Sequence, residues 1–146
     1  MVQVDFHFNA PEKWGYVCRL LRKISSQGKR TGVCGPDDAL QMLHQSLWQL
    51  NPADFVTHCW VTDEAKLLSR SSIILAPEWS SLCAGSRLDV ALNLHHEAPL
   101  DLGFTGRLVE VVGPEEFDKT SARLRWKHYT KQGFTINRYD LSAQSI

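Results

Sequence analysis

Short apolar segments with the character of β-strands alternate with amphipathic helical segments along this chain, and this alternation restricts its fold. Strands are expected at residues 2–8, 30–34, 55–61, 72–75, 90–94, 108–112 and 135–141. Helices are expected after Pro11, after Pro36 and from Glu115 onward. Several strands are almost wholly apolar, which is typical of strands that are buried on both faces of a parallel sheet. We therefore predict an α/β fold, a three-layer Rossmann-like sandwich with a mostly parallel central sheet.

Helical periodicity predicts which residues of the first two helices belong to the core. The core face of the first helix consists of Trp14, Val17, Cys18, Leu21 and Ile24. The core face of the second consists of Leu40, Leu43, His44 and Leu47, with Trp48 at its edge.

Length and charge limit the classes of function. The 146 residues are expected to form a single domain over residues 1–146, because no linker, repeat or low-complexity tract divides them. Lys plus Arg and Asp plus Glu both number 16, so the formal net charge is zero. This balance argues against direct DNA binding, which needs a large cationic surface, although a local basic patch remains possible. No apolar run approaches the ~20 residues that a membrane span requires.

The cysteines and histidines give no clear sign of a metal site or cofactor. The cysteines at positions 18, 34, 59 and 83 lack Cys-x-x-Cys spacing, and buried reduced thiols would suit a cytoplasmic protein. Adjacent strand residues point to opposite faces, so His58 and Cys59 cannot easily share a metal ion. The pair His95-His96 could bind a metal together with Glu97, but we expect a solvated loop there. No metal and no cofactor are therefore expected.

The sequence also lacks the usual marks of a nucleotide-binding enzyme. The segment Gly28-Lys29-Arg30-Thr31 resembles a phosphate-binding loop only in composition, because it has the wrong spacing and leads from a helix into a strand. No Gly-x-Gly-x-x-Gly follows the first strand. No catalytic triad can be identified from the sequence. A noncatalytic role is favoured, and a nucleotide-binding or helicase-like α/β enzyme is the alternative.

The most informative segment for function is the basic helix that precedes the last strand. At ~100° per residue, Lys119, Arg123 and Trp126 fall on one stripe of this helix. Two cations beside a large aromatic ring would suit a ligand that is both acidic and apolar. The alternative is structural, because acidic residues early in the helix and basic residues late in it also complement the helix dipole.

Several segments together resemble the chi subunit of bacterial DNA polymerase III holoenzyme. They are residues 6–8 (FHF), 47–48 (LW), 52–56 (PADFV), 92–94 (LNL), 108–112 (LVEVV), 122–129 (ARLRWKHY) and 133–134 (GF). Their order and spacing are more specific than any single one of them. The resemblance implies a noncatalytic clamp-loader accessory protein of the bacterial cytoplasm. It also implies binding to the acidic C-terminal tail of single-stranded DNA-binding protein, which ends in Pro-Phe, and to a psi subunit where one is present.

The resemblance also suggests which residues bind the tail. The family's tail-binding lysine and arginine match Lys119 and Arg123, and its neighbouring aromatic residue matches Trp126. Its pocket tryptophan and phenylalanine match Trp48 and Phe55. The pocket's aliphatic residue matches Val112, which adds a sixth residue to the expected site.

Overall fold

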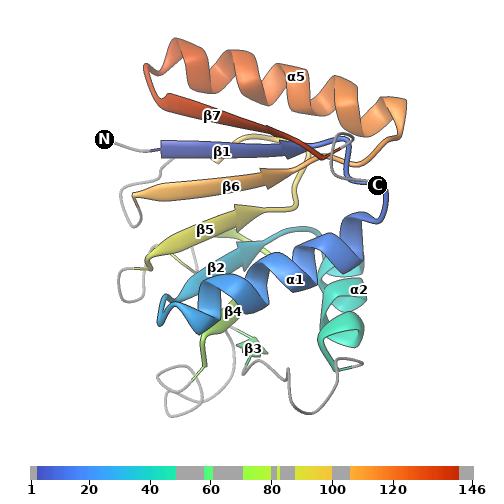
Figure 1. Cartoon of the computed structure of the whole chain (residues 1–146), viewed down its shortest axis with the longest axis vertical. Coiled ribbons are helices and arrows are strands. Elements are labelled where there is room, and N and C mark those ends of the chain that lie inside the picture. Colours follow the sequence, from blue (N-terminus) through green and yellow to red (C-terminus); the bar gives the residue numbers. More distant parts are fainter. Residues whose placement is uncertain are drawn as a thin grey trace.

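A computed structural model describes residues 3–48, 58–60, 71–79, 82, 88–99 and 106–141, although the side chains of residues 48, 58 and 59 are not described. The strands are β1 (Gln3–Phe8), β2 (Thr31–Cys34), β3 (His58–Trp60), β4 (Ile73–Ala76), β5 (Val90–Asn93), β6 (Arg107–Val111) and β7 (Thr135–Asp140). The helices are α1 (Lys13–Ser26), α2 (Asp37–Trp48) and α5 (Glu116–Lys131), arranged as in Figure 1. Elements that fall in the described residues lie where the sequence predicted them, within a few residues.

The strands form one sheet in the order β3-β4-β2-β5-β6-β1-β7, and each recorded pairing is parallel. The prediction of a mostly parallel α/β sheet is therefore confirmed. The strand register places residues that are far apart in the sequence side by side. Phe6 of β1, for example, pairs with Glu110 of β6 on one side and with Arg138 of β7 on the other.

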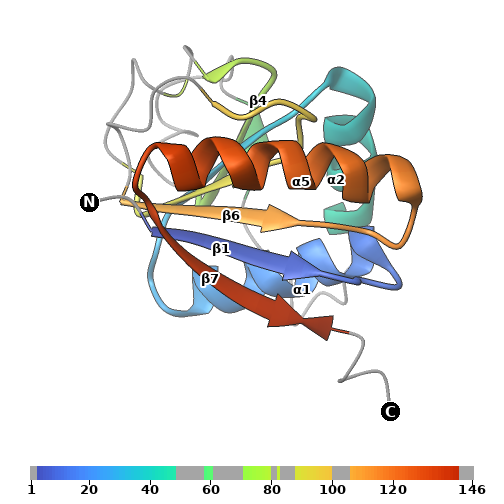
Figure 2. The same cartoon turned by 90° about the horizontal axis from the view of Figure 1, so that it is seen from above.

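The helices cover both faces of the sheet and produce the predicted three layers (Figure 2). Helices α1 and α2 share a core cluster with one face, to which Leu21 and Leu43 contribute. Helix α5 contributes Ala122 and Tyr129 to the cluster on the other face. The predicted core faces of α1 and α2 are buried, except that Trp14 and His44 are only half-buried. Cys18 and Cys34 are buried free thiols, as expected.

Strands β1 and β6 are neighbours, but the helices that follow them lie on opposite faces of the sheet. Helix α1 follows β1 on one face, whereas α5 follows β6 on the other. In open α/β sheets, ligands commonly bind beyond the carboxyl ends of strands at such a switch point. A ligand is therefore expected to bind around the carboxyl ends of β1 and β6. Within the described residues, no helix is both long and apolar enough to cross a membrane.

A buried polar cluster fixes α5 to the sheet. The side chains of Glu110, Arg125, Tyr129 and Asn93 are all at most 4% exposed. The Tyr129 hydroxyl donates to Glu110 Oε2 at 2.5 Å, and Asn93 Nδ2 donates to the same oxygen at 3.0 Å. Arg125 Nε lies 3.1 Å from Glu110 Oε2, and Arg125 also donates to the His96 carbonyl. The basic residue Arg125 therefore belongs to the core, not to the charged surface.

Replacing Tyr129 by phenylalanine tests this cluster. Tyr129→Phe keeps the buried ring but removes one hydrogen bond to Glu110, so we expect the free energy of unfolding to fall by about 1.5–3 kcal/mol. Denaturant unfolding followed by circular dichroism would measure it. The matched control is Tyr139→Phe, because Tyr139 is 43% exposed, and it should change stability by less than about 0.5 kcal/mol. Equal effects of the two changes would contradict the assigned role of Tyr129.

Candidate functional site

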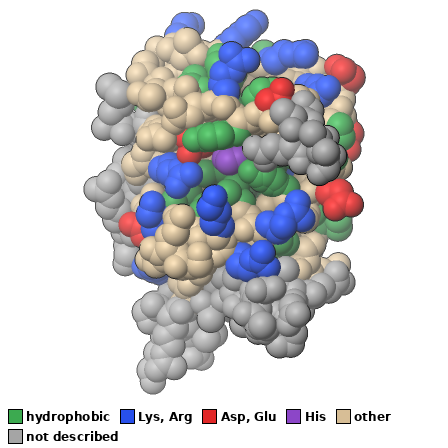
Figure 3. Space-filling model, viewed as in Figure 1, with side chains coloured by type: hydrophobic (Ala, Val, Ile, Leu, Met, Phe, Trp, Pro, Cys, Tyr) green, Lys and Arg blue, Asp and Glu red, His purple; other side chains and the backbone are tan. Residues whose placement is uncertain are grey.

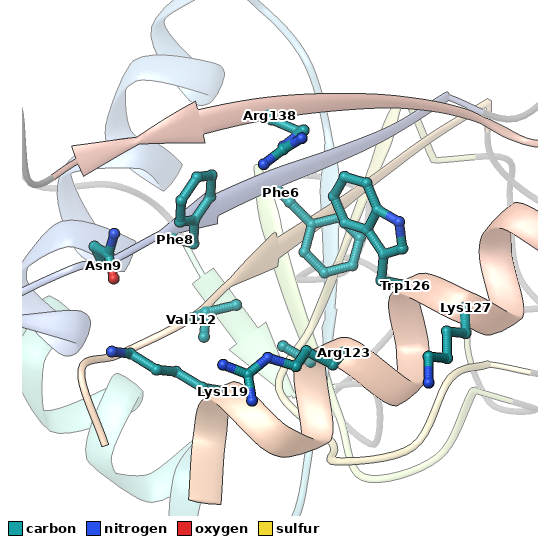
Figure 4. A pocket seen from close by; sticks show the side chains of 10 residues that line it. Phe6, Phe8, Asn9, Val112, Lys119, Arg123, Trp126, Lys127 and Arg138 are labelled. Atoms are coloured by element: carbon teal, nitrogen blue, oxygen red, sulfur yellow. The ribbon is translucent and has the colours of Figure 1, made fainter. Parts of the chain in front are cut away.

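A pocket of about 590 Å³ lies between α5 and the carboxyl ends of β1 and β6, on the α5 face of the sheet. Its lining comprises Phe6, Phe8, Asn9, Val112, Lys119, Ala122, Arg123, Trp126, Lys127 and Arg138. Side chains from α5 and from β7 approach the pocket from two sides, with Phe6, Phe8 and Val112 between them (Figure 4). The pocket therefore combines an apolar floor with a basic rim, and its volume is in the range of sites that bind small ligands or side chains.

The floor is aromatic, and it forms because alternate residues of β1 face α5. Phe6 is 2% exposed and Phe8 is half-buried, and both pack with the α5 side of the core. The rings of Phe6 and Trp126 stand 5.1 Å apart in a tilted arrangement. Trp126 is half-buried, so it does not lie on a purely solvent-exposed stripe of the helix. It packs on the sheet and also forms a wall of the pocket.

The rim is cationic. Lys119, Arg123 and Lys127 are spaced four residues apart, so they occupy successive turns of one face of α5. Arg138 reaches the pocket from β7, with its guanidinium 5.2 Å from the centre of the Trp126 ring and 6.0 Å from that of Phe8. Among the residues that the structure describes, none of these four cations has a carboxylate partner. They are therefore available to an acidic ligand.

The first turn of α5 is held by an anchored carboxylate. Asp118 Oδ2 accepts a hydrogen bond from the Gly113 backbone N–H at 2.7 Å and pairs with Lys13 Nζ at 3.0 Å. A side chain at position 113 would crowd this carboxylate, because a Cβ there would stand 3.3 Å from Asp118 Oδ2. Burial raises the pKa of Asp118, but the Gly113 N–H and the Lys13 charge outweigh burial and lower it overall. This link joins α5 to the start of α1, next to Val112 and Lys119, which line the pocket.

The structure brings together four of the six residues expected at the site. Val112, Lys119, Arg123 and Trp126 line the same pocket. The side chain of Trp48, the last residue of α2, lies outside the described part of the structure, so its place at this pocket stays a prediction. Phe55 lies outside the described residues.

Sequence reasoning missed six lining residues as site residues, namely Phe6, Phe8, Asn9, Ala122, Lys127 and Arg138. Phe6 and Phe8 alternate along β1, a pattern that shows they share a face but not which helix covers it. Arg138 belongs to the last strand, and only the parallel pairing of β7 with β1 sets it opposite Phe6. A signal for the aromatic pair was present in residues 6–8, whereas no local signal marked Arg138.

The paired histidines contact neighbouring loops and elements. His95 Nε2 lies 2.9 Å from the Pro77 carbonyl, and the His96 ring meets Phe117 edge-on at 4.8 Å. No cluster of three or more His, Cys, Asp or Glu with metal-binding geometry occurs in the described part of the chain.

The comparisons of the sequence with known proteins agree on one family. The family model described as "DNA polymerase III chi subunit, HolC" matches residues 1–137. A DNA polymerase III subunit chi from Pseudomonas aeruginosa is 25% identical over 146 residues, covering 97% of this chain and 98% of that protein. One from Haemophilus influenzae is 26% identical over 122 residues, covering 82% of this chain and 81% of that protein. The C-terminal domain of the DEAD-box protein Dbp5 superposes with a TM-score of 0.62 at 9% identity, covering 97% of this chain and 91% of that domain, which shows a shared fold alone.

The anchor at Asp118 can be tested through its dependence on pH. We expect Asp118→Asn to lower the free energy of unfolding by about 1 kcal/mol at pH 7, because it removes the charge that pairs with Lys13. The folded-state pKa of Asp118 is lowered from 3.8, so its contribution is present above that value and is lost as pH falls through the lower pKa. The difference between the unmodified protein and the variant should therefore shrink below about pH 4.

Denaturant unfolding at several pH values would measure this difference. The control is Glu116→Gln in the same helical turn, because Glu116 is exposed and has no ion pair among the described residues. A destabilisation by Asp118→Asn that stays constant down to pH 2 would contradict the assignment.

Proposed function

Because this chain belongs to the family of DNA polymerase III chi subunits, which are replication accessory subunits, we propose that its basic and aromatic pocket binds the acidic C-terminal tail of single-stranded DNA-binding protein. Through this contact the protein would link the protein-coated single strand to the clamp loader of the polymerase. A psi subunit would be its partner in the clamp loader where one is present. The work would take place in the bacterial cytoplasm and would need no cofactor.

The observation that carries this proposal is the combination of an apolar floor with unpaired cations around it. A terminal phenylalanine ring would fit between Phe8, Val112 and Trp126, which form the apolar part of the pocket. Lys119 and Arg123 stand beside that floor, where they can hold the carboxylate of the last residue. Lys127 and Arg138 extend the basic rim along the route that preceding acidic residues would take.

The expected affinity is moderate. Burying a phenylalanine ring contributes roughly 1.5–3 kcal/mol, and each charge-assisted hydrogen bond contributes about as much. After the cost of association, a dissociation constant on the order of micromolar is reasonable. An affinity of this size suits a contact that is made and released repeatedly during replication.

The charges at the switch point count against the nucleotide-binding alternative. Phosphate binds well at the N-terminus of a helix where the backbone N–H groups are free and no negative charge competes. Here Asp118 already accepts a hydrogen bond from the Gly113 N–H, and Glu115 and Glu116 add two more carboxylates at the start of α5. A nucleoside triphosphate placed there would meet like charges.

The role of the cations is tested by Arg123→Ala. A guanidinium can bind a carboxylate with two hydrogen bonds, so we expect tail affinity to fall by about tenfold or more. Calorimetric titration with a synthetic acidic peptide ending in Pro-Phe would measure it. The control is Lys131→Ala, an exposed cation on the same helix outside the pocket lining, which should leave the affinity within about twofold. Similar losses in both variants would indicate general charge attraction and not a site at the pocket.

A shortened tail tests the apolar floor without altering the protein. A peptide that lacks the terminal phenylalanine retains its acidic residues but cannot fill the space beside Val112 and Trp126. We expect it to lose at least tenfold in affinity, which is the value of burying one aromatic ring. The same titration with both peptides at one salt concentration decides the question. Equal affinity for the two peptides would reject the pocket as the place where the tail ends.

A further inference from the structure

A second hollow lies on the opposite face of the sheet, between α1 and the edge formed by β1 and β7. It has a volume of about 560 Å³. Its lining includes His7, Tyr16, Arg19, Lys23, Arg107 and Tyr139. On this face of the molecule a histidine lies in a hollow among hydrophobic side chains, with Lys and Arg side chains around it (Figure 3). The pocket assigned to the tail does not use any of these residues.

Three rings are ordered in this hollow. The Tyr16 hydroxyl and His7 Nδ1 share a hydrogen bond of 2.6 Å. The His7 ring is stacked on Tyr139, with centroids 4.7 Å apart and an angle of 20° between the rings. His7 is 7% exposed, whereas Tyr139 is 43% exposed. Tyr139 is therefore supported from beneath by a fixed ring while much of its own surface meets solvent.

The charges around these rings are mainly positive. Arg19 and Lys23 are exposed on successive turns of α1, and neither has an ion-pair partner among the described residues. Arg107 is different, because its Nε lies 2.7 Å from the buried Asp5 carboxylate. Glu12 is the one carboxylate among the residues known to line the hollow. The whole chain is neutral, but folding gathers unpaired cations beside exposed aromatic surface at this place.

We propose that this hollow binds single-stranded nucleic acid. Arg19 and Lys23 would contact neighbouring phosphates, and a base would stack on the exposed part of the Tyr139 ring. Proteins bind single strands without sequence preference through two features. One is a row of cations along the phosphate backbone, and the other is an aromatic side chain on which bases stack. A double-stranded partner fits less well, because its bases are already stacked and could not reach Tyr139.

The charge state of His7 agrees with its role as the ring on which Tyr139 is stacked. Burial lowers the pKa of His7, the nearby Asp5 charge opposes this effect, and Arg107 and Lys23 add to it. The ring is therefore neutral at neutral pH and can stack on Tyr139 without carrying a charge into the hollow. The attraction for phosphate comes from Arg19 and Lys23.

The two sites are separated by the sheet itself. Neighbouring residues of β7 point to opposite faces, so Arg138 lines the first pocket and Tyr139 lines the second hollow. One molecule could therefore hold the protein tail on the α5 face and a single strand on the α1 face at the same time. This inference does not depend on the proposed tail binding, and the two can fail separately.

The test is fluorescence anisotropy with a labelled oligothymidylate of about 20 nucleotides, titrated with the protein at several salt concentrations. Two phosphate contacts predict that the logarithm of the affinity falls with the logarithm of salt with a slope of about −1.4. The double variant Arg19→Gln/Lys23→Gln should bind at least tenfold more weakly at about 50 mM salt, with a slope near zero. Tyr139→Ala should lose about tenfold, whereas Tyr139→Phe, which keeps the ring, should bind like the unmodified protein.

Controls separate this site from the tail pocket and from general charge. Arg123→Ala and Lys131→Ala should leave oligonucleotide affinity within about twofold, and a saturating acidic tail peptide should not displace the strand. Circular dichroism would establish that each variant is folded. The proposal is overturned if the unmodified protein shows no binding at about 10⁻⁴ M, the weak end of nonspecific binding. It is equally overturned if Arg123→Ala abolishes binding while the Arg19/Lys23 double variant retains it, or if the tail peptide competes.

Discussion

The buried contact between Glu110 of β6 and Arg125 of α5 is the interaction on which the arrangement of the α5 face depends. Both side chains are almost fully enclosed, and Tyr129 and Asn93 both donate hydrogen bonds to Oε2 of the carboxylate. Burial raises the pKa of Glu110, while the Arg125 charge and the hydrogen bonds favour its ionised form. Because an unpaired buried charge costs several kcal/mol, the helix is confined to the one rotation that keeps this pair together.

That rotation decides what the other charged residues of α5 can do. With Arg125 directed into the sheet, residues two positions earlier and later are turned by about 200° around the helix axis, so they lie on the side of the helix away from Arg125. Arg123 and Lys127 therefore stand at the rim of the pocket, and Trp126 packs against Phe6. The same helix thus supplies a structural cation and several cations with no carboxylate partner among the described residues. The resulting pocket matches an acidic chain with an apolar end, which is the ligand proposed for this member of the chi family.

Sequence reasoning succeeded where a local pattern carried the information. The alternation of strands and helices predicted the three-layer sandwich, and helical periodicity put Lys119, Arg123 and Trp126 on one stripe. It left Phe6 and Phe8 out of the site, because the alternation of a strand does not show which helix covers each face. It also grouped Arg125 with the other late basic residues of α5, because a buried arginine cannot be recognised before its partner, 15 residues away on another element, is known.

The sequence by itself determined the class of fold, the core faces of the helices and the stripe of cations on α5, because these depend on repeats within one segment. Tertiary structure alone decided that Arg138 and Phe6 meet, since β1 and β7 are neighbours only through parallel pairing of the two ends of the chain. It also decided the distribution of charge. The net charge of zero is a sum over all residues, whereas binding depends on which charges are paired. Pairing between distant residues, such as Asp5 and Arg107, is set by the folded chain.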